Sequence, residues 1–116
     1  MTGLDKCYTS AVFCRSKSQI HAVKNLNLEI NDGELLGILG HNGAGKTTLF
    51  GMLTGLIEPT SGTAIISNYD ISKDMDKVRQ TIGVCPQFDI LWDELTAEDH
   101  LYMFAKLKCT HSLIFL

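Results

Sequence analysis

The sequence lacks the cysteine patterns of disulfide-rich and zinc-binding proteins and the long apolar run of a membrane span. Its four cysteines form no C-x-x-C pair and have no histidine at zinc-finger spacing. They indicate reduced thiols of a cytosolic protein rather than a disulfide framework. No stretch approaches the roughly 20 apolar residues of a membrane span, and the N-terminus lacks a secretory signal pattern. We therefore expect a chain that is not itself inserted in a membrane.

Basic residues are scarce as well. Ten Lys and Arg stand against 13 Asp and Glu, which gives a net charge of -3, and no basic cluster occurs along the chain. Because nucleic-acid binding needs cations that neutralise a row of phosphates, we expect no nucleic acid among the partners. With 45% hydrophobic and 20% charged residues, the 116 residues have the composition of one globular domain.

Hydrophobic periodicity predicts strands on both sides of a turn near residue 32. Residues 22–30 alternate apolar and polar side chains, as in a half-buried strand, and residues 34–39 form a nearly continuous apolar run. The second pattern is typical of a strand covered on both faces in a parallel sheet. Residues 31–33 are a turn sequence, so we expect the two strands to form an antiparallel hairpin.

Helical and shorter strand patterns follow. Residues 46–56 have apolar side chains at helical spacing and end at a segment rich in Pro and Gly. Short strands are predicted at 63–67 and 81–85, with a polar helix at 73–80 between them. Thr96 and Asp99 approximate a capping box that opens a last helix, with Leu101, Phe104 and Leu107 on one face. The fold class is therefore α/β.

The strongest functional signal is the stretch GHNGAGKTT. Gly40, Gly45, Lys46 and Thr47 fit G-x-x-x-x-G-K-[ST], directly after a predicted buried strand and directly before a helix. Glycines let backbone N–H groups turn inward around an anion, and the helix N-terminus adds partial positive charge. Lys46 would reach the β- and γ-phosphates of a nucleotide, and Thr47 would complete the coordination of Mg²⁺. The predicted cofactor-binding set is Gly40, Asn42, Gly43, Ala44, Gly45, Lys46, Thr47 and Thr48, which would hold the phosphates of a nucleotide and Mg²⁺.

The residues around this loop resemble one family. LGHNGAGKTT, LTGLIEPTSGTA and IGVCPQFDILWDELTAEDHLYMFAKLK are similar to the nucleotide-binding domain of ATP-binding cassette (ABC) transporters, in particular to subfamily A, the large lipid-handling exporters. The resemblance runs over about residues 22–108, and the tail 109–116 does not share it. It implies a P-loop NTPase fold of the ABC ATPase type with an antiparallel β subdomain.

The resemblance also implies roles for residues outside the loop. Gln87 would be the catalytic glutamine of the Q-loop, which helps to ligate Mg²⁺ and to place the attacking water. An aromatic side chain would stack on adenine, and Phe13 and Tyr8 are the candidates, Phe13 having the better spacing. Phe88, Leu91 and Trp92 would contact a transmembrane domain, although packing in the domain's own core is the alternative. His41 is given no catalytic role, and His100 is predicted to be an ordinary surface or core residue.

Several features of the family do not occur here. The second Mg²⁺-binding strand, the LSGGQ signature and the switch histidine are absent, so we interpret residues 1–116 as a partial nucleotide-binding domain, truncated before those elements. As part of a complete domain it would hydrolyse ATP to ADP and phosphate to drive lipid transport, at the cytoplasmic face of a membrane. Its partners would be a transmembrane domain and a second nucleotide-binding domain. The alternative is an isolated ATP-binding fragment without hydrolysis or transport.

Overall fold

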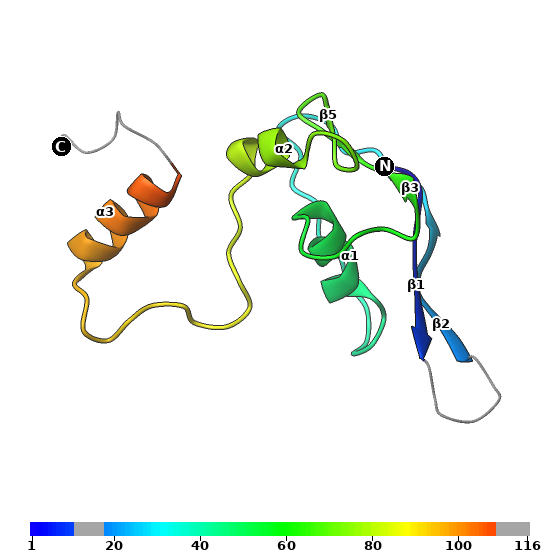
Figure 1. The fold of residues 1–116 in the computed structure, drawn as a ribbon, viewed down its shortest axis with the longest axis horizontal. Coiled ribbons are helices and arrows are strands. Elements are labelled where there is room, and N and C mark those ends of the chain that lie inside the picture. Colours follow the sequence, from blue (N-terminus) through cyan, green and yellow to red (C-terminus); the bar gives the residue numbers. More distant parts are fainter. Residues whose placement is uncertain (11–17, 109–116) are drawn as a thin grey trace. The chain divides into compact units, whose positions relative to one another are not determined.

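The computed structural model describes residues 1–10 and 18–108 (Figure 1). These residues belong to two compact units, Met1–Ile82 and Gly83–Leu116. The first unit contains all the strands that the structure describes and two helices, and the second contains one helix. The phosphate-loop motif therefore lies in the first unit, and Gln87 lies in the second.

A three-stranded antiparallel sheet forms one side of the first unit. Strand β1 (Thr2–Ser10) pairs with β2 (Ser18–Leu26) and with β3 (Ser61–Thr63), so the strand order is β2-β1-β3. Leu4 pairs with Leu26 near one end of the β1–β2 ladder, and irregularities in register follow on either side of Lys6. This sheet is the antiparallel β part that the family resemblance implied.

A small hairpin extends this unit. Strands β4 (Ile65–Ile66) and β5 (Tyr69–Asp70) are joined by Ser67 and Asn68, both at positive φ, as a two-residue turn of a twisted hairpin requires. Asp70 accepts hydrogen bonds from the Thr63 hydroxyl and the Ser72 N–H, which lower the pKa of its carboxyl. The predicted strand at 63–67 is therefore confirmed in outline, although it is divided into β3 and β4.

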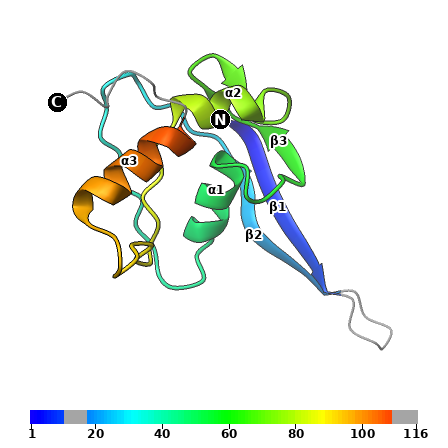
Figure 2. The same ribbon diagram turned by 60° about the vertical axis from the view of Figure 1, so that its left-hand side comes forward.

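Two helices complete the core of the first unit. Helix α1 (Lys46–Leu53) begins inside the predicted phosphate loop, and α2 (Met75–Thr81) confirms the predicted polar helix. Figure 2 shows α1 beside β2. Burial of apolar side chains is the main favourable term in such packing, and the buried core consists of Leu4, Leu49, Met52, Ala64, Ile71 and Val78.

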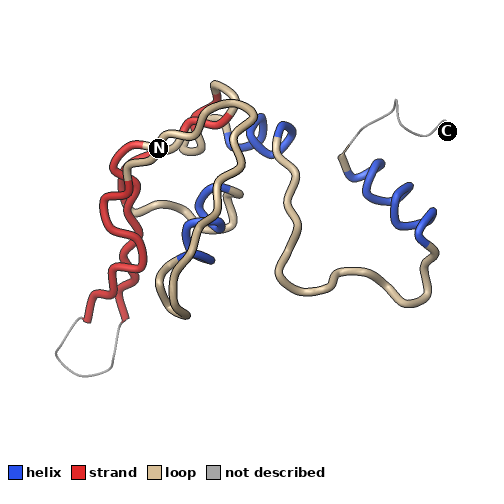
Figure 3. Tube along the Cα trace, turned by 180° about the vertical axis from the view of Figure 1, so that it is seen from behind, coloured by secondary structure: helices blue, strands red, loops and turns tan. Residues whose placement is uncertain are grey.

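The predicted hairpin around residue 32 is wrong. Strand β2 ends at Leu26, and no strand lies in residues 27–45, which Figure 3 draws as loop. The turn itself exists, since the Glu34 N–H donates to Asn31 O at 3.2 Å. Most of the apolar run after it is exposed, with Leu35 99% and Leu39 96% exposed, while Ile38 is partly buried against the core. A fully buried strand needs paired strands on both edges and packing on both faces, and among the described residues no strand pairs with this segment.

The strand predicted at residues 81–85 is also absent. Helix α2 continues to Thr81, and residues 82–85 are not part of a strand. Val84 is exposed. The same physical reason applies, because an apolar run becomes a strand by pairing and not by composition alone.

Helix α3 (Ala97–Leu107) begins with the capping box that the sequence predicted. The Asp99 N–H donates to the Thr96 hydroxyl oxygen at 3.2 Å, and the Thr96 N–H donates to the Asp99 carboxylate at 3.1 Å. The Thr96 hydroxyl also donates to this carboxylate at 2.6 Å. The hydrogen bonds that Asp99 accepts lower the pKa of its carboxyl below the ordinary value of 3.8, and the bond from the Thr96 hydroxyl has the largest effect.

The capping box predicts how the stability of α3 depends on pH. Since the folded pKa of Asp99 is lowered, its contribution is complete above pH 3.8 and is lost as the pH falls through the lower folded value. We expect Asp99→Asn to reduce helix content at neutral pH and to remove this acid-dependent loss, measured by circular dichroism. Glu98→Gln, in the same helical turn but outside the box, is the control. An acid transition identical in wild type and Asp99→Asn would contradict the assignment.

Candidate functional site

The glycine loop is fixed by a close approach between its last glycine and β2. Gly45 is the N-cap of α1, with φ of 88° and ψ of 4°, and Gly43 has φ of 85°. A Cβ at Gly45 would lie 2.0 Å from the carbonyl oxygen of Ala22, whereas one at Gly43 would meet nothing within 4 Å. The two glycines are therefore required for different reasons: Gly43 for its left-handed backbone, and Gly45 for the same backbone and for its contact with β2.

The N-terminus of α1 lacks the partners that a helix start normally has. Gly45 provides no side-chain cap, and the first turn contains no acidic side chain. The first hydrogen bond into the helix runs from the Leu49 N–H to Gly45 O at 2.9 Å, so the N–H groups of residues 46–48 precede the helical ladder. The contrast with α3, which has a full capping box, is plain. This helix start is suited to accepting an external anion.

Lys46 brings a positive charge to the same loop. Its ammonium donates to the carbonyl oxygens of Gly40 and of His41, the latter at 2.9 Å. The side chain thus curls back over the loop instead of extending into water. A cation held by two backbone carbonyls beside open N–H groups is arranged to bind an oxyanion.

The other predicted loop residues are gathered around Lys46. Thr47 is exposed and Thr48 is half-buried, both in the first turn of α1, while Asn42 and Ala44 are exposed in the loop. The Ala44 N–H donates to His41 O at 3.2 Å. The sequence segment therefore forms one continuous loop and helix start.

The remaining predicted residues lie elsewhere. Gln87 is exposed and belongs to the second unit, whereas the phosphate loop belongs to the first. Phe13 lies outside the described residues. Tyr8 is exposed on β1, with the Lys6 ammonium 5.3 Å from its ring centroid.

The sequence did not reveal the contacts of His100 in the second unit. His100 is buried in α3 and stacks on Trp92, with ring centroids 6.2 Å apart and an interplanar angle of 18°. Both of its ring nitrogens have hydrogen-bond partners. The sequence does place Trp92 before His100 and Phe104 one helical turn after it, so ring contacts are possible. The spacing of these residues does not specify that the contacts form.

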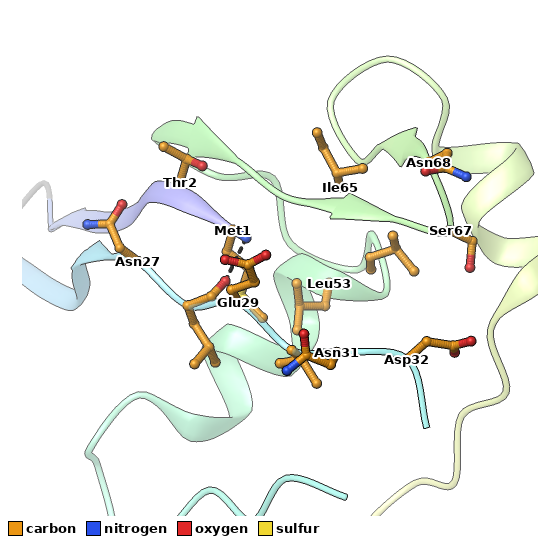
Figure 4. A pocket seen from close by; sticks show the side chains of 13 residues that line it. Met1, Thr2, Asn27, Glu29, Asn31, Asp32, Leu53, Ile65, Ser67 and Asn68 are labelled. Atoms are coloured by element: carbon orange, nitrogen blue, oxygen red, sulfur yellow. Dashed lines mark hydrogen bonds between the residues drawn. The ribbon is translucent and has the colours of Figure 1, made fainter. Parts of the chain in front are cut away.

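A cavity of about 1310 Å³ also lies in the first unit (Figure 4). It is lined by Met1, Thr2, Leu53 and the segments 27–32 and 65–68. The Met1 amino group donates to Leu28 O at 2.8 Å beside it. None of the phosphate-loop residues lines this cavity, so the loop and the cavity are separate features.

Neither a metal-binding cluster nor a membrane-spanning helix occurs in the part of the chain that the structure describes. Within it, no three His, Cys, Asp or Glu side chains gather closely enough to form a metal site of their own. No described helix combines the length and the apolar composition required to cross a membrane.

The loop and its helix define a phosphate-binding-loop protein, and comparisons with known proteins give the family. The ABC transporter family model matches residues 23–114. The human phospholipid-transporting ATPase ABCA3 is 50% identical over 108 residues, which are 93% of this chain and 6% of that protein. ABC transporter A family member 8 of Dictyostelium discoideum is 51% identical over 106 residues, 91% of this chain and 12% of that protein.

The fold agrees with this family. A solved structure of an ATP-binding subunit of an ABC transporter matches with a TM-score of 0.73 and 24% identity, covering 96% of this chain and 42% of that one. The chain belongs to the ABC transporter family, and the predicted P-loop fold and the resemblance to subfamily A are confirmed. It spans a small part of the curated relatives that it matches.

The two glycines of the loop provide a test of its architecture. We expect Gly43→Ala to lower the free energy of unfolding by about 1 kcal/mol, the cost of a left-handed backbone. Gly45→Ala adds the clash with Ala22 O and should cost about 2–4 kcal/mol. Urea unfolding of the two variants measures the difference. Equal losses would show that the contact between Gly45 and β2 does not constrain the loop.

Proposed function

We propose that this chain binds MgATP through residues 40–48 and forms the nucleotide-binding portion of an ABC transporter. The observation that carries the proposal is the uncapped N-terminus of α1 beside the Lys46 ammonium. Family membership supports nucleotide as the source of the phosphates. ATP would replace the carbonyls of Gly40 and His41 as partners of Lys46.

The residues present fit a phosphate chain and its metal ion. The backbone N–H groups of Gly43, Gly45 and Lys46 would surround the β-phosphate, and Thr48 would contact the α-phosphate. The exposed Thr47 hydroxyl would coordinate Mg²⁺ together with phosphate oxygens. Gln87 would complete the metal site and orient water for hydrolysis.

The purpose of binding would be transport. The name of the human relative states that it is a phospholipid-transporting ATPase, and a lipid is accordingly the proposed cargo. Hydrolysis of ATP by the complete domain, paired with a second nucleotide-binding domain, would drive the cargo across a membrane, and the domain would lie at the cytoplasmic face of that membrane. Binding of ATP without hydrolysis is the alternative for the chain by itself.

The segment after Gln87 would receive the transmembrane domain. Phe88 is 78% and Trp92 52% exposed, and Ile90 and Leu91 are also exposed in the second unit. A cluster of apolar side chains in one loop indicates a surface that another protein covers. Trp92 shares its surface between this face and its stack on His100, so both the docking and the packing interpretations apply to it.

Removal of the Lys46 charge tests nucleotide binding. We expect Lys46→Ala to weaken ATP binding by about 10- to 100-fold, because a charge-assisted contact with the β- and γ-phosphates is lost. Binding of a fluorescent ATP analogue to the full 116-residue chain provides the measurement. Lys24→Ala, which removes an exposed cation from β2, should leave the affinity unchanged. Equal affinities of wild type and Lys46→Ala would exclude the proposed site.

Removal of the Phe88 ring tests docking. In a transporter that carries this domain, we expect Phe88→Ala to reduce ATP-driven transport about 10-fold while ATP affinity is kept, because an exposed apolar anchor is lost and the phosphate loop is not. Leu101→Ala, which removes a similarly exposed apolar side chain from α3, is the matched control. Parallel losses of transport and affinity in Phe88→Ala would instead indicate a folding role.

A further inference from the structure

The side chain of His100 joins the loop that follows Gln87 to helix α3. The Trp92 N–H donates to His100 Nε2 at 2.9 Å, and His100 Nδ1 lies 2.9 Å from Thr96 O. A backbone N–H can only donate and a carbonyl can only accept, so Nε2 is the acceptor and Nδ1 carries the proton. One neutral tautomer thus satisfies both partners at once.

Ring contacts reinforce these two bonds. The imidazole stacks on Trp92 on one side, and its centroid is 6.4 Å from that of Phe104, which lies one helical turn further along α3, with an interplanar angle of 24°. His100 is 8% exposed, although all residues from Gly83 to Asp99 are exposed. This buried polar side chain is therefore the anchor of an otherwise exposed segment.

Local bonds stiffen the segment between Gln87 and this anchor. The Leu91 N–H donates to the Asp89 carboxylate at 3.0 Å, and the Leu95 N–H donates to Trp92 O at 3.1 Å. The capping box then fixes Thr96 to the start of α3. Residues 89–96 therefore form a turn with internal hydrogen bonds, and His100 joins this turn to helix α3 through the Trp92 N–H.

We propose that His100 is a positioning residue that clasps the Gln87 loop to helix α3. Gln87 precedes Trp92 by five positions, so any movement of α3 is passed through the His100–Trp92 bond to the turn that begins at Asp89 and then to Gln87. Without the clasp, the loop moves independently of the helix. This role in placing Gln87 rests on the proposed function, but the clasp itself does not.

Three substitutions separate the two bonds of the ring. In His100→Gln, the side-chain carbonyl can take the place of Nε2 and accept from the Trp92 N–H. In His100→Asn, the amide N–H can take the place of Nδ1 and donate to Thr96 O, but the acceptor for Trp92 is lost. His100→Leu removes both bonds. Trp92 is the sole tryptophan of the sequence, so its fluorescence reports on the clasp directly.

The first measurement needs no nucleotide. In the full 116-residue chain, we expect Trp92 amide exchange to be about tenfold faster in His100→Asn and His100→Leu, with altered Trp92 emission. His100→Gln should remain within about twofold of wild type. The helix content of α3 should be kept in the Gln and Asn variants. Unchanged exchange in His100→Asn, failure of His100→Gln to restore protection, or loss of α3 in both would each overturn the clasp.

The second measurement concerns Gln87. In a transporter carrying this domain, we expect His100→Asn to lower kcat of ATP hydrolysis several-fold with KM unchanged, and His100→Gln to restore it. Faster Trp92 exchange with unchanged kcat would overturn the positioning role. Failure of the proposed function has a different signature, because the wild-type chain would then not bind ATP at all.

Discussion

The contact between Gly45 and the backbone of β2 is the constraint on which the candidate site depends. The Ala22 carbonyl occupies the space that any side chain at position 45 would need. This contact sets the start of α1 against the sheet, and the start of α1 in turn determines where the N–H groups of residues 46–48 and the Lys46 ammonium converge. A glycine-rich loop without this contact would have the same composition, but its N–H groups would not be held in one direction relative to the sheet.

The N-termini of helices α1 and α3 differ in how they are capped. Helix α3 is closed by the Thr96–Asp99 box, whose carboxylate and hydroxyl satisfy its first turn. Helix α1 has neither an acidic side chain in its first turn nor a side-chain cap, which leaves part of its partial charge uncompensated. Of these two helix ends, the one without a side-chain cap or an acidic first turn is the one that carries the phosphate-loop sequence.

Local signals in the sequence were predictive where structure is local. The capping box, the helix after the glycine loop and the polar helix near residue 77 follow from side chains a few positions apart, and all three occur. The apolar run of residues 34–39 predicts a strand covered on both faces, but its periodicity does not identify the partner, and most of the run is exposed. The hydrogen bonds of His100 join a loop to a helix, and no periodic pattern in the sequence predicts them.

Amide chemical-shift mapping of the full chain tests the central claim most directly. Addition of MgATP, or of inorganic triphosphate, should shift the backbone N–H signals of Gly43, Gly45 and Lys46, and adenosine should leave them unchanged. Signals from the cavity lined by Met1 and the segments 27–32 and 65–68 should not move. Equal responses to adenosine and triphosphate, or shifts confined to that cavity, would contradict a phosphate site at the start of α1.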